Sequence, residues 1–454
     1  MISRTQWFIL EKWNLDHNSK TERRYMEIKR SKYLNKLVEK RNNGLIKIIT
    51  GIRRCGKSYL LFHLFYDYLI SSGIPAENIV CISLDDIDYE ALRDPYVLNE
   101  FIKSRISDKS QQYYVFIDEA QYAISKEETK NPDRPIRLYG VLNSLLRKDN
   151  VDVYITGSNS KFLSSDVMTE FRGRGDEVHI APLAFSEYYP ASGKEKADAW
   201  NDYLFFGGLP HILAEPDHEA KSSYLNRLNR EIYLKDICER YDIREKSGME
   251  SLMKVLASAV GSLSNPQKIS DTFKSSGNNG ISMPTISNYL NHLQESFIIQ
   301  KAERYDIKGR KYISTPSKYY YSDLGLRNAL LNFRQFEENH LMENAIYNEL
   351  IYRGYSVDVG VVEMRVNEVG KKVRRQLEVD FVINQAGKRY YIQSAFALPD
   401  KDKMEQEQAS LIRIPDSFKK IVVVGGNSPI WRNEAGITVM GIYDFLLNEN
   451  SLDL

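Results

Sequence analysis

The pattern of hydrophobic residues divides the chain into a first part of alternating strands and helices and a second part of different texture. Between residues 45 and about 190, short apolar runs rich in β-branched and aromatic residues are separated by helical patterns. The runs are LIKIIT (45–50), IVCISL (79–84), YYVFID (113–118) and VDVYIT (151–156). Apolar strands that alternate with helices predict a parallel sheet covered on both faces, which is a three-layer α/β domain.

After residue 200 the pattern becomes mainly helical, and the helical stretch 283–296 follows a GNNG turn. Residues 304–321 predict a short hairpin with its turn at KGRK (308–311). From residue 340 a helix leads into a second α/β unit, with strands expected near 355–362, 376–384, 389–395 and 420–424. We therefore expect three domains, 1–195, 196–330 and 331–454, with a basic helix over 20–41 in the first.

Composition is that of a globular protein, with 42% hydrophobic and 27% charged residues. Lys and Arg number 62 against 61 Asp and Glu, so any affinity for nucleic acid must come from a local patch. The cysteines, Cys55, Cys81 and Cys238, are far apart and predict neither disulfides nor a zinc site. The chain shows no signal-peptide pattern and no apolar run of about 18 residues, so we expect a cytoplasmic protein without a membrane partner.

The segment GIRRCGKS (51–58) has the spacing of a phosphate-binding loop: Gly, four residues, Gly, Lys and then Ser or Thr. It directly follows the strand LIKIIT and opens a helical stretch, so backbone N–H groups and the helix N-terminus can surround phosphates. Lys57 is expected to reach the β- and γ-phosphates, and the Ser58 hydroxyl to bind magnesium. The predicted nucleotide-binding residues are Gly51, Ile52, Arg53, Arg54, Cys55, Gly56, Lys57, Ser58 and Tyr59.

A second motif, YYVFIDEAQ (113–121), ends an apolar strand in two acids. Because the ends of parallel strands gather at one edge of the sheet, these acids are expected beside the loop. Asp118 is predicted to hold magnesium, and Glu119 to orient and deprotonate the attacking water. The two motifs together predict ATP and Mg²⁺ as cofactors.

Two further segments offer candidates for the reaction. The run VDVYIT continues into TGSNS (156–160), where Asn159, or Ser158 as the alternative, is expected near the γ-phosphate, although such residues also cap helices. In EFRGRGDE (170–177), Arg172 and Arg174 are candidate arginine fingers, acting on a neighbouring subunit if the protein forms a homo-oligomer. The alternative is that they pair with Asp176 and Glu177. Similarly, Arg53 and Arg54 contact phosphate or pair with nearby acids.

The stretches TGIRRCGKSYLL, FIDEAQ, ITGSNSKFL, GRGDEVHIAPLAFSEYY and YLFFGGLPHIL together resemble a large prokaryotic group of AAA-superfamily ATPases with a C-terminal domain of unknown function. The resemblance implies a P-loop core of the additional-strand, catalytic-glutamate type. It also implies a winged-helix-like element near 245–325 and a terminal fold related to restriction-endonuclease-like nucleases. Gly51, Gly56, Lys57, Ser58, Asp118 and Glu119 match the family's nucleotide motifs without departure.

If the middle region is a winged helix, 283–296 is its recognition helix and Ser287, Asn288 and Asn291 face the major groove of DNA. The hairpin turn carries three cations suited to phosphate contact, namely Lys308, Arg310 and Lys311. Winged helices also dock proteins, so both partners, double-stranded DNA and a protein, stay open.

A nuclease of the implied fold needs a helix glutamate, a strand aspartate and a Glu-x-Lys pair that hold a metal and activate water. Glu343 or Glu349 supplies the first and Asp380 the second. The next strand offers Gln393 and Ala395 in place of the glutamate and lysine, so we expect no nuclease activity.

These observations predict a Mg-dependent, ATP-hydrolysing AAA-type ATPase that acts as a switch or motor on DNA or a partner. The alternative function is a nucleotide-gated, protein-binding regulator with little turnover, and an ATP-dependent nuclease is disfavoured.

Overall fold

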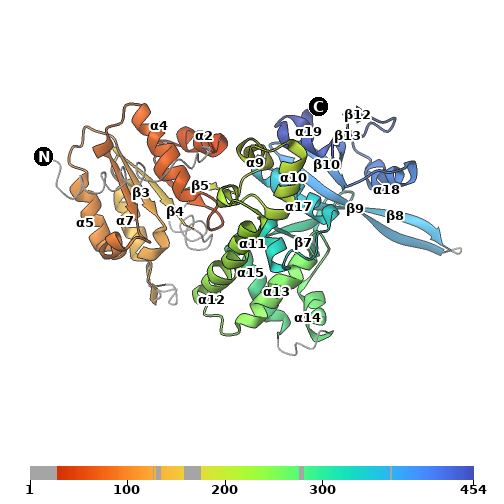
Figure 1. Ribbon diagram of the computed structural model, residues 1–454, viewed down its shortest axis with the longest axis horizontal. Coiled ribbons are helices and arrows are strands. Elements are labelled where there is room, and N and C mark those ends of the chain that lie inside the picture. The colour runs from red at the N-terminus through yellow and green to blue at the C-terminus, as the bar shows by residue number, and fades with distance from the viewer. Residues whose placement is uncertain (1–27, 126, 129–133, 158–174, 276–280, 369–370) are drawn as a thin grey trace.

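The computed structural model describes residues 28–125, 127–128, 134–157, 175–275, 281–368 and 371–454 (Figure 1). The N-terminal body is built on five parallel strands in the order β2-β3-β4-β1-β5. The strands are β1 (Ile46–Thr50), β2 (Ile79–Ser83), β3 (Tyr113–Asp118), β4 (Val151–Thr156) and β5 (Gly175–His179). The predicted parallel α/β sheet is confirmed, and β4 between β1 and β3 is the additional strand that the resemblance implied.

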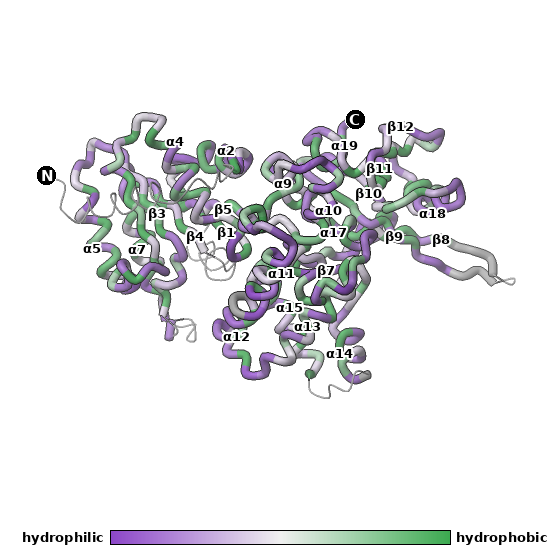
Figure 2. Tube along the Cα trace, in the orientation of Figure 1, coloured by the Kyte–Doolittle hydropathy of each residue, from purple (hydrophilic) through white to green (hydrophobic). Residues whose placement is uncertain are grey.

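Helices cover both faces of this sheet. Successive residues of β1 point to opposite faces, so Ile48 joins one apolar cluster and Ile49 the other. Figure 2 shows hydrophobic residues concentrated along these strands. The covering helices are α2 (Ser31–Glu39), α3 (Lys57–Tyr59), η1 (Leu60–Phe65) and α4 (Tyr66–Ser71) on one face, and α5 (Pro95–Arg105) and α7 (Arg137–Leu146) on the other.

The middle region is helical, as the sequence predicts. Its helices are α9 (Phe185–Ser192), α10 (Lys196–Phe206), α11 (His218–Arg227), η7 (Leu228–Leu234), α12 (Lys235–Arg240), α13 (Lys246–Ser258), α14 (Pro266–Ser275), α15 (Met283–Glu295) and α16 (Leu324–Leu330). The expected recognition helix corresponds to α15, on which Asn288 and Asn291 are exposed and Ser287 is half-buried. Short 3-10 turns occur at Ala76–Asn78, Ile87–Arg93, Ala120–Ala123, Pro210–Ala214 and Ser451–Asp453.

The C-terminal body contains a mixed eight-stranded sheet in the order β12-β13-β11-β10-β9-β8-β6-β7. Its strands are β6 (Ile299–Asp306), β7 (Lys311–Tyr321), β8 (Ser356–Glu368), β9 (Lys371–Gln385), β10 (Lys388–Ala395), β11 (Lys419–Val424), β12 (Trp431–Arg432) and β13 (Thr438–Gly441). The helices α17 (Glu338–Arg353), α18 (Lys401–Ile412) and α19 (Ile442–Leu447) complete it. The hairpin expected in the middle region, β6–β7, joins this sheet because β6 pairs in parallel with β8.

The antiparallel strands β8 and β9 pair in register out to Glu368 and Lys371, and the ribbon that they form projects beyond the body (Figure 1). Among the described residues, no helix is long and apolar enough to cross a membrane.

A buried carboxylate joins two separate segments of the helical region. Asp323, at the N-terminus of α16, accepts hydrogen bonds from Gly208 N at 2.7 Å and Leu326 N at 3.0 Å. Gly207 and Gly208 approach so closely that an added Cβ would lie 2.3 Å from the Asp323 carboxylate and 2.4 Å from Leu183 O, respectively. The FGGLP segment noticed in the sequence is therefore a tight turn fixed by this carboxylate.

We expect Asp323→Ala to lower the free energy of unfolding by about 2–5 kcal/mol, because two buried N–H groups lose their acceptor. Urea unfolding followed by tryptophan fluorescence measures the loss. Asp217→Ala is the matched control: Asp217 is an exposed N-cap that accepts from Ala220 N at 2.8 Å, and its loss costs about 1 kcal/mol. Equal losses in the two variants would contradict the role given to Asp323.

Candidate active site

The loop between β1 and α3 has the backbone of a phosphate-binding turn. Gly51 has φ 142° and Gly56 φ 101°, both in the region that favours glycine. A Cβ at Gly51 would lie 2.1 Å from Ile180 O, so no side chain fits there. The helix that starts at Lys57 presents its N-terminal N–H groups to the loop, which provides an anion site at this end of the sheet.

Lys57 is buried and bends over the loop. Its Nζ donates to Gly51 O at 3.0 Å and to Ile52 O at 3.2 Å. Two neutral carbonyl acceptors are weaker partners for an ammonium group than phosphate oxygens. The predicted phosphate-binding lysine therefore already points into the turn that would surround the phosphates.

The two strand-end motifs meet at one carboxylate. Asp118 accepts hydrogen bonds from Ser58 Oγ at 2.7 Å and from Thr156 Oγ1. Burial raises the pKa of Asp118 to about 6, opposed by these hydroxyl donors and supported by the charge of Glu119. A hydroxyl and a carboxylate oxygen in contact are the ligand types that Mg²⁺ takes beside nucleotide phosphates, so Ser58 and Asp118 fit the predicted metal site.

Glu119 follows directly and has φ 50° and ψ 48°, which turns the chain sharply at the strand end. Its backbone N donates to Thr156 Oγ1 at 3.1 Å. Its carboxylate accepts a hydrogen bond from the Gln121 amide. Thr156 thus fixes both acids, and Gln121 is the side chain with which a water molecule would compete for Glu119.

The remaining predicted loop residues differ in placement. Ile52 and Cys55 are buried, and Cys55 Sγ donates to Ile180 O at 3.4 Å, so these two can reach nucleotide only through the backbone. Arg54 and Tyr59 are exposed, and the Tyr59 ring stacks on His63.

Arg53 contacts the helical region instead of the loop's own domain. Its guanidinium lies 3.6 Å from Asp236 of α12, which also pairs with Arg240 at 2.7 Å. The buried Tyr233 of η7 donates its hydroxyl to Arg53 O at 2.7 Å. The acid that Arg53 contacts thus lies in the helical region, and a contact of Arg53 with phosphate stays a prediction.

Ser158, Asn159, Arg172 and Arg174 lie outside the described residues. The two acids that were considered as their local partners have other contacts. Asp176 pairs with Lys40, and Glu177 accepts from Thr50 Oγ1 at 2.5 Å.

Sequence reasoning missed Thr156 and His179 as site residues. Thr156 is the polar residue that ends an apolar run, but the sequence pattern led us to expect the later Asn159 near the γ-phosphate. His179 ends β5, and its ring lies 4.7 Å from that of Phe297, which follows α15. Burial, and then the charge of Lys57, lowers the pKa of His179 to about 4, so the ring is neutral where the P-loop domain meets the segment between α15 and β6.

The nuclease-like residues also come together in the C-terminal sheet. Lys318 Nζ, from β7, lies 2.8 Å from Glu343, 2.7 Å from Glu378 and 3.6 Å from Asp380. Burial opposes its charge, but the carboxylates outweigh burial and raise the pKa of Lys318. Burial, and then Glu343, raises the pKa of Asp380.

Three further contacts complete this carboxylate centre. Gln393 Oε1 accepts from Asp380 N at 3.4 Å, and Tyr320 OH donates to Glu343 at 2.6 Å. Gly261 packs on the Glu343 carboxylate, 3.1 Å from an added Cβ. Glu349, the alternative helix glutamate, pairs with Arg353 at 2.7 Å. Ala395 stands where a nuclease of the implied fold has a lysine, and Lys318 on β7 is its counterpart here. The Lys318 ammonium group, however, is buried and bound by the surrounding acids.

The parallel sheet, the loop and the Ser58–Asp118 contact define an AAA-type P-loop ATPase domain. The profile of the family described as "AAA domain" matches residues 43–189, and that of "Domain of unknown function (DUF8612)" matches residues 197–337. An uncharacterized protein of Haemophilus influenzae is 32% identical over 425 residues, which cover 92% of this chain and 98% of that protein. The chain belongs to this family of AAA-domain proteins with a C-terminal domain of unknown function.

More distant similarities are also found. An uncharacterized protein of Methanocaldococcus jannaschii is 29% identical over 398 residues, 84% of this chain and 81% of that protein. A Walker-type ATPase of Pyrococcus abyssi has a TM-score of 0.48 at 16% identity, over 69% of this chain and 99% of that chain. The Orc1 protein of Aeropyrum pernix, solved in complex with DNA, has a TM-score of 0.27 at 13% identity, over 67% and 92%.

We expect Thr156→Val to reduce ATP turnover by roughly 5- to 100-fold, since loss of a hydrogen bond to a charged group costs about 1–3 kcal/mol. Nucleotide affinity should change much less, because Thr156 contacts the acids and not the loop. Thr156→Ser keeps the hydroxyl and should restore most of the rate. Steady-state phosphate release and nucleotide titration measure the two quantities. A Ser variant as slow as the Val variant would contradict the hydrogen-bonding role.

Proposed function

We propose that the protein is a Mg²⁺-dependent ATPase that uses hydrolysis to switch the contact between its P-loop domain and its helical region. The observation that carries the proposal is the joint contact of Ser58, Asp118 and Thr156 beside Lys57, with Glu119 next in the chain. This arrangement offers a phosphate site, a metal site and a base at one edge of the sheet.

In the proposed reaction, bound Mg–ATP supplies the phosphoanhydride and a cation that offsets its negative charge. Lys57 exchanges its carbonyl acceptors for the β- and γ-phosphate oxygens. Ser58 and Asp118 hold the metal, while Thr156 keeps the two acids in register. Glu119 exchanges its bond from Gln121 for one to the attacking water, orients that water and accepts its proton. Asn159, Arg172 and Arg174 are proposed to act near the γ-phosphate, with the arginines supplied by a neighbouring copy if the protein assembles.

The switch part of the proposal is supported by Arg53. It belongs to the loop that would surround the phosphates, yet its side chain and carbonyl are held by Asp236 and Tyr233 of the helical region. A change in the loop on binding or hydrolysis would shift these contacts and so reach η7 and α12 directly.

Two alternatives remain from different classes. A nucleotide-gated regulator would bind ATP tightly, turn it over little and act on a protein partner through the C-terminal regions. A nuclease is disfavoured because Lys318 lies bound among Glu343, Glu378 and Asp380, and Gly261 covers Glu343.

We expect wild-type protein to hydrolyse ATP with magnesium, Lys57→Ala to lose nucleotide binding, and Glu119→Gln to bind nucleotide without turnover. The reason is that Lys57 supplies phosphate affinity and Glu119 supplies the base. Phosphate release and fluorescent-nucleotide binding measure these outcomes. Tight binding by the wild type with turnover no faster than that of Glu119→Gln would favour the regulator and overturn the ATPase proposal.

We expect Asp236→Asn to uncouple the helical region from the loop. Exposed or half-exposed ion pairs contribute up to about 1 kcal/mol, so ATP affinity should change by no more than about fivefold. Hydrogen exchange in η7 and α12 should respond to ATP in the wild type and respond weakly in the variant. Glu239→Gln is the control and should behave as wild type, because Glu239 lies on the same helix and its one ion pair among the described residues is with Lys235 at 3.9 Å. An undiminished response in Asp236→Asn would contradict the coupling.

A further inference from the structure

The turn between β6 and β7 lies on the C-terminal sheet and is held there. Ile307 N donates to Val361 O at 3.1 Å, and Asp306 Oδ1 accepts from Gly309 N at 2.9 Å. Ile307 is buried in the apolar cluster of that sheet. The cations of the turn are therefore presented by a fixed backbone, beside β8 and not at a free hairpin tip.

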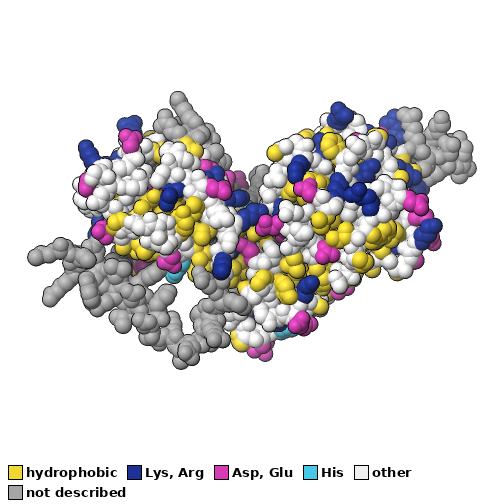
Figure 3. Space-filling view, turned by 90° about the horizontal axis from the view of Figure 1, so that it is seen from above, with side chains coloured by type: hydrophobic (Ala, Val, Ile, Leu, Met, Phe, Trp, Pro, Cys, Tyr) yellow, Lys and Arg dark blue, Asp and Glu magenta, His cyan; other side chains and the backbone are white. Residues whose placement is uncertain are grey.

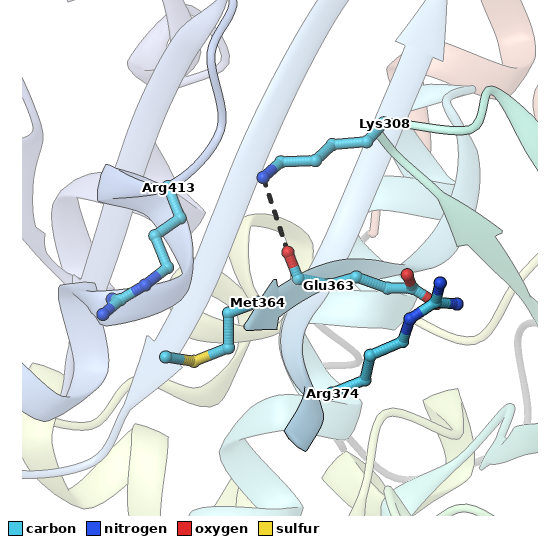
Figure 4. Close-up of a pocket in the computed structure, with 5 residues that line it drawn as sticks. All are labelled: Lys308, Glu363, Met364, Arg374 and Arg413. Atoms are coloured by element: carbon cyan, nitrogen blue, oxygen red, sulfur yellow. Dashed lines mark hydrogen bonds between the residues drawn. The ribbon is translucent and has the colours of Figure 1, made fainter. Parts of the chain in front are cut away.

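One side of the turn borders a hollow of about 460 Å³ at the root of the β8–β9 ribbon. Lys308, Arg374 and Arg413 line it with Glu363 and Met364, and Lys308 Nζ donates to Glu363 O at 3.4 Å (Figure 4). The three cations come from the hairpin turn, from β9 and from the residue that follows α18. Three separate segments thus place positive charge around one hollow.

The other side of the turn borders a second hollow of about 670 Å³. Arg310 lines it together with Lys388, Arg389 and the exposed ring of Phe418, and with the amide side chains of Asn384 and Gln385. Lys388 is paired with Asp453 at 2.9 Å. Arg389 lies over the Tyr305 and Phe418 rings. Of the cations that line this hollow, Lys388 has a carboxylate partner among the described residues, whereas Arg310 and Arg389 have none there.

Lys308, Arg310, Arg374 and Arg413, here called the turn surface, are all exposed, and none forms an ion pair with a described carboxylate. Glu363 is the acidic side chain that lines the first hollow, where it stands against three cations. Figure 3 shows Lys and Arg side chains gathered on the half of the molecule that holds the C-terminal sheet. An exposed cluster of unpaired cations on a chain of net charge +1 is a local patch that favours a polyanion.

We propose that the turn surface binds the phosphate backbone of double-stranded DNA. This proposal gives the ATPase switch proposed above a partner. It rests on that proposed function only for the effect of nucleotide on DNA binding. Binding would place Lys308, Arg374 and Arg413 on phosphates at the ribbon root and Arg310 on the far side of the turn. The helix α15, the expected recognition helix, exposes Asn288 and Asn291 but no Lys or Arg, so it does not supply the charge that such binding needs.

The chemistry of the surface favours a duplex over other polyanions. Its unpaired recognition groups are cations, and both hollows are lined more by polar than by large apolar side chains. Such a surface gains most from the partner with the densest regular charge, and duplex DNA carries about one charge per 1.7 Å. Single strands are held largely by stacking on several aromatic rings, whereas among the described residues that line these hollows Phe418 is the one aromatic side chain.

The test is fluorescence anisotropy with a labelled duplex of about 20 base pairs at roughly 0.1 M salt and without nucleotide. The variant is Lys308→Ala/Arg374→Ala/Arg413→Ala. The control is Lys103→Ala/Lys109→Ala/Arg147→Ala, which removes equal charge from exposed positions of the P-loop domain. We expect the first variant to bind at least about tenfold more weakly, with a log–log salt slope smaller by roughly 2–3, and the control to bind as wild type.

Lys308→Arg/Arg374→Lys/Arg413→Lys keeps the charges and should keep the affinity, which separates loss of contact from loss of folding. The proposal is overturned if the wild type does not bind the duplex, if the alanine variant and control weaken equally, or if Asn288→Ala/Asn291→Ala weakens binding as much as the alanine variant. Competition by polyglutamate as strong as that by unlabelled duplex would point to an acidic protein and also overturn it. Lys57→Ala should bind the duplex as wild type does. The DNA-binding result can therefore be interpreted even if the protein does not hydrolyse ATP.

Discussion

The carboxylate of Asp118 is the contact on which the nucleotide site depends. It ends β3 and accepts hydrogen bonds from Ser58 at the start of α3 and from Thr156 at the end of β4. The three segments are remote in sequence, and only the parallel order β3-β4-β1 brings their ends to one edge. A buried carboxylate is costly without donors, so the site holds its geometry only while both hydroxyl groups are in place. The same contact leaves Glu119 at a fixed position one residue further on.

The rest of the molecule is connected to this edge by polar contacts at a few points. Tyr233 and Asp236 hold Arg53 in the loop. Within the helical region itself, Asp323 joins the FGGLP turn to α16. A further contact joins the P-loop domain to the C-terminal body, since Lys32 of α2 donates to Tyr352 O of α17 at 2.5 Å. A change in loop conformation therefore has a short path into the helical region. The carboxylate centre around Lys318 in turn joins β7 to α17 and β9, so the hairpin and the C-terminal sheet are expected to move together.

The sequence predicted the elements whose pattern is set by burial on both faces. β3 and β4 have the predicted limits, and β1 and β2 differ from them by one residue at one end. β5 was not predicted, because GDEVH is largely polar, and its place in the sheet comes from pairing with β1. The ends of β8 and β9 were missed for a related reason: residues 363–375 contain few apolar side chains, since this ribbon extends beyond any core.

The site residues divide in the same way into those that local sequence predicts and those that it does not. Lys57, Ser58, Asp118 and Glu119 were assigned from local motifs, whereas the Arg53–Asp236 pair and Lys318 among its carboxylates depend on tertiary contacts that no local spacing encodes.

The position of the β6–β7 hairpin decides how the C-terminal half can meet a partner. A wing with a free tip would place Lys308 and Arg310 beside the exposed face of α15, and DNA would then be contacted by helix and wing together. Because β6 pairs in parallel with β8, the hairpin turn instead lies on the C-terminal sheet, close to Arg374 and Arg413. Lys308 and Arg310, two of the three cations that the sequence assigned to the hairpin turn, thus belong to a surface that β9 and the residue after α18 complete. Since β7 also carries Lys318, any shift of the hairpin that follows nucleotide turnover would act on this surface and on the carboxylate centre at once.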